Sequence, residues 1–166
     1  MTHRVGVCLV AILGACHPAA PRDWESRYAD GALHARGRYA AGLREGAWRE
    51  WHENGKLWLE GAYHAGVRTG PWVEYDYTGT KIFEGRYVNG RLDGPWRTYG
   101  AGGRERASGR SVDGRLEGVV VTHSSDGMRI EATWKANKLD GPMTIYDAGG
   151  AVVQVVQFRG GVEAKP

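Results

Sequence analysis

Residues 66–90 read GVRTGPWVEYDYTGTKIFEGRYVNG, and the pattern of this stretch recurs along most of the chain at a spacing of 24 residues. The spacing shortens once to 23 residues, between Gly118 and Gly141. Three repeat positions illustrate this spacing. One is occupied by Gly46, Gly70 and Gly94, the next by Trp48, Trp72 and Trp96, and the third by Trp51, Tyr75 and Tyr99. Self-similarity at a fixed period of about 20 to 50 residues indicates a repeat array, so the architecture is decided by the repeat.

The composition agrees with a thin, extended protein. The chain has 166 residues, of which 42% are hydrophobic and 25% charged, as in ordinary soluble proteins. It has 26 glycines, about twice the usual share, and most of them lie at repeat positions. Seven Trp and eight Tyr against two Phe favour half-exposed sheet faces over a deep interior, because Trp and Tyr carry a polar group on an apolar ring.

Charge and ligand-type residues narrow the function. The formal net charge is +3, and basic residues alternate with acidic ones along the repeats, which is typical of a solvated face and predicts no nucleic-acid partner. The histidines of the repeats lie at unrelated positions, and neither a C-x-x-C nor an H-x-x-x-H spacing occurs. We therefore expect no metal and no cofactor.

Each period contains two strand-length runs separated by turn residues. In the quoted stretch, residues 70–75 and 80–87 predict strands, and residues 76–79 and 88–94 predict turns. Dipeptides such as Asn89-Gly90 tolerate positive φ and favour tight hairpins. Frequent glycines disfavour helix. The predicted fold class is all-β, an elongated single antiparallel sheet of stacked β-hairpins with a period of about 24 residues.

Strand alternation assigns residues to two faces, because successive side chains point to opposite sides of a sheet. Trp72 and Glu74 share one face, whereas Val73 and Tyr75 share the other. One row is predicted to contain Trp48, Trp72, Trp96, Val120 and Met143, and the opposite row Trp51, Tyr75, Tyr99, His123 and Tyr146. Aromatic side chains concentrate binding energy at interfaces. The predicted binding residues are Trp51, Tyr75, Tyr99, Tyr146, Trp48, Trp72 and Trp96. The alternative is that these rings only hold the sheet together.

The N-terminus has the features of a secretory signal. A short basic start precedes an apolar run over residues 5–13, which is about half the length needed to span a bilayer. Leu13, Gly14, Ala15 and Cys16 follow, and this order resembles a bacterial lipoprotein signal peptide, in which Cys16 would be acylated. The expected organisation is a signal peptide at 1–15, a tether at 16–23, repeats at 24–161 and a tail at 162–166. An ordinary secretory signal remains the alternative.

The repeat itself resembles a known family. Its cadence G-x-Y-x-x-G-x-x-x-G-x-W-x-x-Y is carried here by Gly61, Tyr63, Gly66, Gly70, Trp72 and Tyr75. This cadence resembles the MORN repeat, closest to a bacterial variant, and the resemblance covers nearly all of residues 24–161. Residues 109–125 depart most from it, with Ser111 and Val120 at aromatic positions. The resemblance implies stacked β-hairpins that bind protein or lipid and carry no catalytic residues. Some bacterial members are labelled antitoxins.

These observations lead to one functional hypothesis and two alternatives. We expect a lipid-anchored protein of the bacterial cell envelope, at the outer membrane or periplasmic face, held to the membrane through Cys16. Its repeats would form a non-catalytic surface for an unknown protein or cell-wall component. The first alternative is an antitoxin-like protein that binds a toxin. The second is a glycan hydrolase using Glu60 and Glu84, although the repeat explains this pair without chemistry.

The last repeat carries an unusual strand. Residues 151–158 read AVVQVVQF, with no charge and apolar residues on both faces. Such a segment is a hazard at the edge of a sheet, because unpaired strands promote association. Arg159, Glu163 and Lys165 follow it as charged residues that oppose aggregation.

Overall fold

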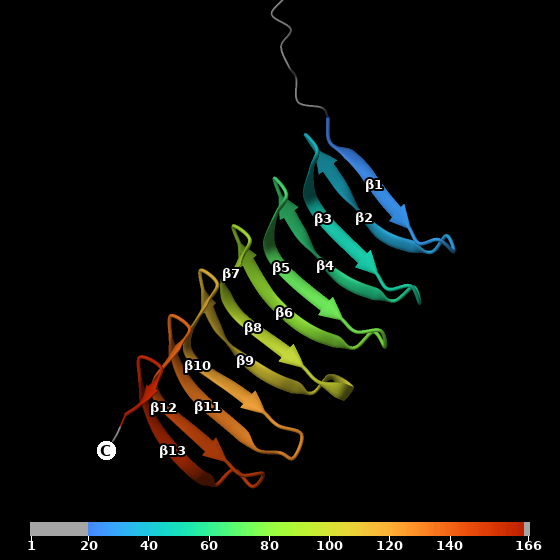
Figure 1. The fold of residues 1–166 in the computed structure, drawn as a ribbon. Coiled ribbons are helices and arrows are strands. Elements are labelled where there is room, and N and C mark those ends of the chain that lie inside the picture. The colour runs from blue at the N-terminus through green and yellow to red at the C-terminus, as the bar shows by residue number, and fades with distance from the viewer. Residues whose placement is uncertain (1–19, 165–166) are drawn as a thin grey trace, which may run out of the picture.

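The computed structural model describes residues 20–164, which form one open antiparallel sheet of 14 strands (Figure 1). Neighbouring strands follow one another in sequence from β1 to β14, apart from the short β7, which pairs with β6 off the main path. Residues 20–164 contain no α-helix, and only a 3-10 turn at Ala101–Gly103. The predicted fold class is therefore confirmed.

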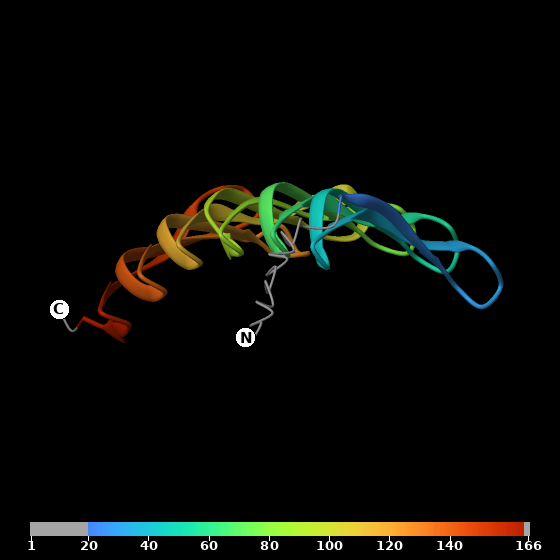
Figure 2. The same cartoon turned by 90° about the horizontal axis from the view of Figure 1, so that it is seen from above.

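The strands are β1 (Arg22–Arg27), β2 (Leu33–Ala40), β3 (Leu43–Trp51), β4 (Leu57–His64), β5 (Val67–Tyr75), β6 (Lys81–Val88), β7 (Arg91–Leu92), β8 (Gly94–Tyr99), β9 (Glu105–Val112), β10 (Arg115–His123), β11 (Arg129–Lys135), β12 (Lys138–Tyr146), β13 (Val152–Arg159) and β14 (Val162–Glu163). Successive hairpins are displaced along one long axis, with β1 at one end and β13 at the other (Figure 1). Seen from above, the sheet is arched (Figure 2). Cys16 and the predicted signal peptide lie outside the described residues.

Two kinds of turn alternate along the sheet. At one end of the strands, two-residue loops place both residues at positive φ, as at Asn89 (49°) and Gly90 (78°), which is the backbone twist that suits a hairpin. At the other end, longer loops such as residues 52–56 place one glycine, Gly55, at positive φ (78°). The predicted turn over residues 88–94 was too long, because the chain re-enters the sheet at Arg91.

The glycine two residues before Trp48, Trp72 and Trp96 lies in a bulge of its strand. On β4 the neighbours of Gly61 pair with Val73 and Thr69, so one residue of β4 faces three residues of β5. Gly70 lies in this bulge at a φ of 67°. A bulge re-aims the side chain beside it, and here it directs Trp72 over Gly61, where an added Cβ would lie 2.3 Å from the Trp72 ring.

Adjacent repeats are joined through their two-residue turns. The amide of Gly66 donates to the carbonyl of Arg44 (2.9 Å), and that of Gly90 donates to the carbonyl of Arg68 (3.0 Å). In addition, the Glu45 carboxylate accepts a hydrogen bond from the amide of Ala65 (2.8 Å). These bonds fix the step from one repeat to the next, since each one links equivalent points of neighbouring hairpins.

Candidate binding surface

The two sheet faces differ in how far a partner could reach into them. We call the Trp face the side that carries Trp48, Trp72 and Trp96. Trp48 and Trp72 are 1% and 0% exposed, and Trp96 is half-buried. A partner on the assembled sheet would not reach these two indoles, because both are packed inside it.

Aromatic rings and arginines pack in alternation on the Trp face. Tyr39 and Tyr63 both meet the Trp48 ring edge to face, with centroids 5.7 and 5.8 Å away. The Arg44 guanidinium lies over the same indole at 4.3 Å. Arg68 repeats this contact over Trp72 at 4.2 Å. Such cation–π and edge-to-face contacts stabilise a single-layer sheet that has no second sheet to cover it.

We call the polar face the opposite side, which carries a ladder of tyrosine and glutamate pairs. The tyrosine hydroxyls donate to glutamates of the neighbouring strands. These bonds join Tyr75 to Glu60 (3.4 Å), Tyr99 to Glu84 (2.5 Å) and Tyr146 to Glu131 (3.2 Å). All three tyrosines are half-buried, so part of each ring remains accessible. Three of the predicted binding residues therefore share one face at equivalent points of different repeats.

The other two residues predicted for the row of Tyr75, Tyr99 and Tyr146 lie outside the hydrogen-bonded ladder. Trp51 is half-buried, and its carbonyl accepts a hydrogen bond from the Tyr28 hydroxyl (2.7 Å). His123 is half-buried at the end of β10. The structure thus divides the seven predicted residues between two faces, and only Tyr75, Tyr99 and Tyr146 share the hydrogen-bonded ladder.

Basic side chains complete the ladder and set its electrostatics. The Lys81 ammonium donates to Glu84 (2.8 Å), and Arg49 donates to Glu60 (3.1 Å). The hydrogen bond from Lys81, followed by the one from Tyr99, lowers the pKa of the Glu84 carboxyl below its ordinary value of 4.5. Burial, reinforced by the charge of Glu60, raises the pKa of Tyr75. At neutral pH the Glu84 carboxyl is therefore ionised and the Tyr75 phenol is neutral.

This ladder predicts a pH-dependent stability that Glu84→Gln should reduce. The lowered pKa means that the Glu84 carboxylate stabilises the fold above its unfolded pKa, and that this stabilisation is lost as the pH falls through the folded pKa. At neutral pH we expect Glu84→Gln to lower the free energy of unfolding by about 0.5–1 kcal/mol, because the pair is partly exposed. In acid the two proteins should converge.

Urea unfolding of both proteins across the acidic range measures this difference. Glu53→Gln, which alters an exposed turn residue of the same type, is the matched control and should follow the wild type throughout. A Glu84→Gln deficit that stays constant from neutral to acidic pH would contradict the assignment.

Glu84 is poorly suited to act as the general acid of glycoside hydrolysis. A general acid needs a raised pKa, so that it keeps its proton at neutral pH. The pKa of Glu84 is lowered instead, and Glu60 is hydrogen-bonded to Tyr75 and Arg49. These contacts explain why a carboxylate recurs at this position of the repeat without assigning it a reaction.

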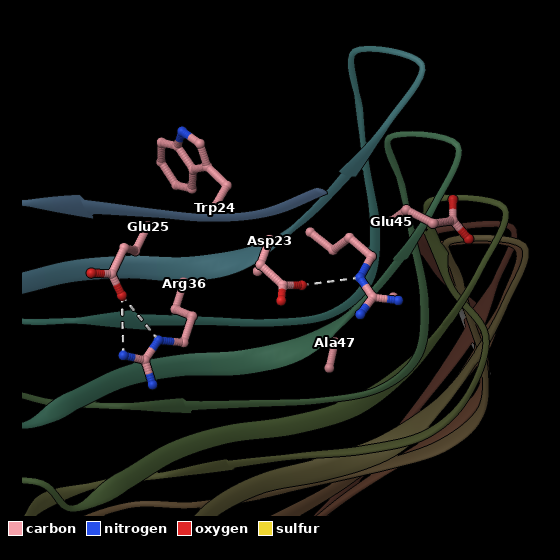
Figure 3. A pocket seen from close by; sticks show the side chains of 9 residues that line it. Asp23, Trp24, Glu25, Arg36, Glu45 and Ala47 are labelled. Atoms are coloured by element: carbon pink, nitrogen blue, oxygen red, sulfur yellow. Dashed lines mark hydrogen bonds and ion pairs between the residues drawn. The ribbon is translucent and has the colours of Figure 1, made fainter. Parts of the chain in front are cut away.

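A shallow depression lies at the N-terminal end of the sheet. It has a volume of about 700 Å³ and is lined by β1, β2 and β3. Figure 3 shows Asp23, Glu25 and Arg36 on its wall, with Trp24 projecting from the other side of β1. Glu25 and Arg36, which face each other on β1 and β2, form an ion pair (3.1 Å) on this wall. An adjoining hollow is lined by Arg49, Pro71 and Val73, so the concave region continues along the polar face.

The period of the repeat does not predict one exposed aromatic cluster. Trp58 and Tyr77 are 39% and 56% exposed, and their rings flank His52 at centroid distances of 5.8 and 4.2 Å. The signal was present in the sequence, because one period later the equivalents of Trp58 and Tyr77 are Ile82 and Ala101. The aromatic residues that break the repeat, Trp58 and Tyr77, are exposed, whereas those that define it include the buried Trp48 and Trp72.

Two further features concern residues 20–164. No group of three or more His, Cys, Asp or Glu side chains in this range is arranged to hold a metal ion. In the same range there is no helix that is both long and apolar enough to cross a membrane.

Comparison with known proteins identifies one repeat unit. A family model described as a MORN repeat variant matches residues 44–65, which run from β3 to the turn that follows β4. The comparison with curated proteins gives no match. The matched unit contains Trp48 and Tyr63, whose edge-to-face contact recurs in the next repeat between Trp72 and Tyr87.

Proposed function

We propose that the chain is a non-catalytic scaffold of MORN-type repeats, which binds another macromolecule along its polar face. The observation that carries this proposal is the ladder of partly accessible tyrosines and charged residues at equivalent points of successive repeats. A repeated surface of this kind presents the same chemistry at regular intervals, which suits an extended partner. The concave region beside Arg49 and Val73 adds apolar contact area to it.

The partner class follows from the side chains of this face. Arg49 and Arg97 are 62% and 57% exposed at their side chains, and the tyrosine rings lie between charged groups of both signs. Tyr and Arg are the residues that most often dominate protein–protein binding energies. A protein or a cell-wall component therefore fits this face better than a small molecule in a closed pocket.

We further propose that Cys16 anchors the scaffold to a bacterial membrane. The support is the order Leu13, Gly14, Ala15, Cys16 after an apolar run. The first strand begins at Arg22, so only a short segment separates Cys16 from the sheet. Fully extended, this segment spans about 20 Å, which would hold the N-terminal end of the sheet near the lipid surface.

One experiment tests both parts of this proposal. The full chain is expressed in a bacterial host with a palmitate analogue and a photoreactive amino acid in place of Val73, on the polar face. We expect the protein to carry the label, to sediment with membranes and to form a cross-linked adduct with a partner. Cys16→Ala should lose the label and leave the membrane fraction.

The double variant Tyr75→Ala with Tyr99→Ala addresses the surface. It should keep label and membrane location but lose the adduct, with an unchanged circular dichroism spectrum. An adduct of equal yield would refute binding by these tyrosines, and a lost fold would assign them to sheet stability alone. Full-length, unlabelled protein in the cytoplasm would instead favour the antitoxin-like alternative.

A further inference from the structure

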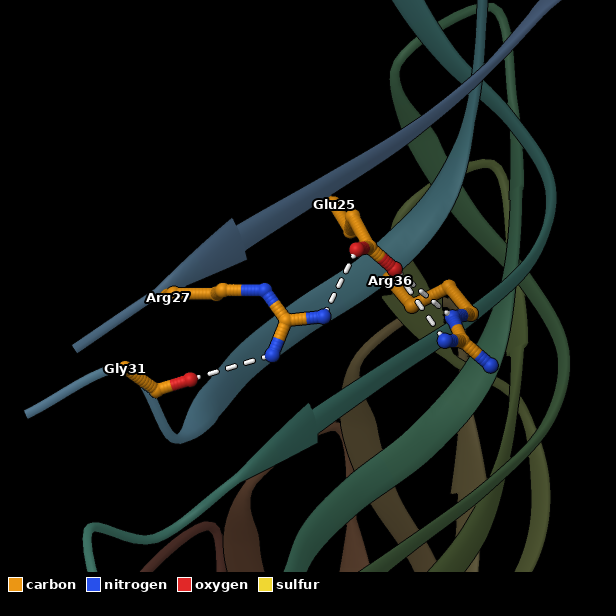
Figure 4. Close-up of polar contacts among 4 residues, drawn as sticks. All are labelled: Glu25, Arg27, Gly31 and Arg36. Atoms are coloured by element: carbon orange, nitrogen blue, oxygen red, sulfur yellow. Dashed lines mark hydrogen bonds and ion pairs between the residues drawn. The ribbon is translucent and has the colours of Figure 1, made fainter.

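The two edges of the open sheet have opposite chemistry. β1 reads RDWESR and is protected by charge: Glu25 accepts hydrogen bonds from Arg27 (2.9 Å) and Arg36 (3.1 Å). Figure 4 shows these contacts, together with the bond from Arg27 to the carbonyl of Gly31. Charged side chains on an edge strand prevent another strand from pairing with it.

The opposite edge lacks this protection. β13 reads VVQVVQFR, and it carries no charge before Arg159. Val153 and Val155 are 59% and 53% exposed. On its inner side, β13 pairs with β12 along its length. On its outer side, it pairs with β14 only at Phe158 and Arg159. Within residues 20–164, no other strand covers the outer side of Val152–Val156.

We propose that β13 pairs antiparallel with β13 of a second copy of this chain, which joins two sheets edge to edge across a two-fold axis. The uncharged strand is complementary to itself. With Gln154 opposite its symmetry mate, Val153 faces Val155 and Val152 faces Val156. Cross-strand pairs of β-branched residues stabilise such a ladder, and an interface of this type closes as a dimer.

The C-terminal turn fixes the register. β14 occupies the outer side of Phe158 and Arg159, and the amide of Ala164 donates to the carbonyl of Gln157 (2.8 Å). Only residues 152–156 therefore remain open to a second copy, and this centres the pairing on Gln154. Pairing with β1 of another copy would place the charged Glu25 and Arg27 against valines. Pairing of β13 with a second β13 is therefore favoured over pairing of β13 with β1.

A charge exchange at Gln154 tests the two-fold axis. Full chains carrying Cys8→Ser and Cys16→Ser are used, so that neither thiol forms a cross-link. Sedimentation velocity should show a concentration-dependent dimer. Gln154→Lys and Gln154→Glu should each raise the dissociation constant about tenfold or more, because like charges would then face each other across the axis. An equimolar mixture of the two variants should restore the dimer.

Thr122→Lys is the matched control, since Thr122 is an exposed polar residue of a central strand. It should leave the dimer unchanged. A protein that stays monomeric at every concentration would overturn the proposal. So would a dimer that survives Gln154→Lys, or variants whose mixture stays monomeric. This result is independent of what the polar face binds.

Discussion

Replacing Trp72 with alanine is expected to lower the free energy of unfolding by about 3–5 kcal/mol. The indole is 0% exposed, and it contacts Tyr63 and Tyr87 edge to face as well as the Arg68 guanidinium. Its removal leaves a cavity between two repeats that no second layer can fill. Because domains are stable by only about 5–15 kcal/mol, a large fraction of the protein should unfold at moderate temperature.

Chemical unfolding followed by circular dichroism measures this loss. Trp58→Ala is the matched control, because Trp58 is an indole of the neighbouring β4 that is 39% exposed. We expect this control to cost about 1 kcal/mol or less. Equal losses for the two variants would mean that the Trp face is not the core of the sheet.

Gly61→Ala is expected to destabilise the sheet by about 1–3 kcal/mol or more, although it adds a single methyl group. An added Cβ would lie 2.3 Å from two atoms of the Trp72 ring, which is far below van der Waals contact. The indole and the bulge that holds it must then move. Gly100→Ala is the control, because no atom lies within 4 Å of its added Cβ and its φ is −99°.

A double-mutant cycle identifies the cause of this loss. In a Trp72→Ala background the ring that the new methyl group would strike is absent, so Gly61→Ala should cost close to nothing there. The two substitutions should therefore couple strongly. Additive losses would contradict the proposed contact and assign the effect of Gly61→Ala to strand propensity.

The sequence predicted the fold because the repeat specifies it at several levels. Period, turn dipeptides such as Asn89-Gly90 and strand alternation all favour consecutive hairpins, and the structure has this topology. The extent of the turns was not predictable, because Gly94 looks like a turn glycine although it lies within the sheet at a φ of 107°. A bulge and a turn use the same residue type for the same reason, which is access to positive φ.

The buried face was not predictable from alternation alone. Both faces carry aromatic residues, so the pattern does not show whether the face of Trp72 or the face of Tyr75 is buried. Burial of Trp72 depends on the bulge at Gly70 and on the space above Gly61, and both are properties of paired strands. The contacts of Tyr75 with Glu60, fifteen positions away, also depend on register. The cluster of Trp58 and Tyr77 around His52 follows neither from strand alternation nor from the period, because its aromatic residues break the repeat.

The hydrogen bonds between successive turns have a consequence for how the protein can vary in length. The amides of Gly66, Gly90 and Gly114 donate to the carbonyls of Arg44, Arg68 and Leu92. Each repeat is therefore attached to the neighbouring repeat by the same hydrogen bond. Adding or deleting a whole 24-residue unit would preserve every such contact. The distance between the two ends would then change in fixed steps of about 9.6 Å, two strand spacings, while the surface chemistry stayed the same.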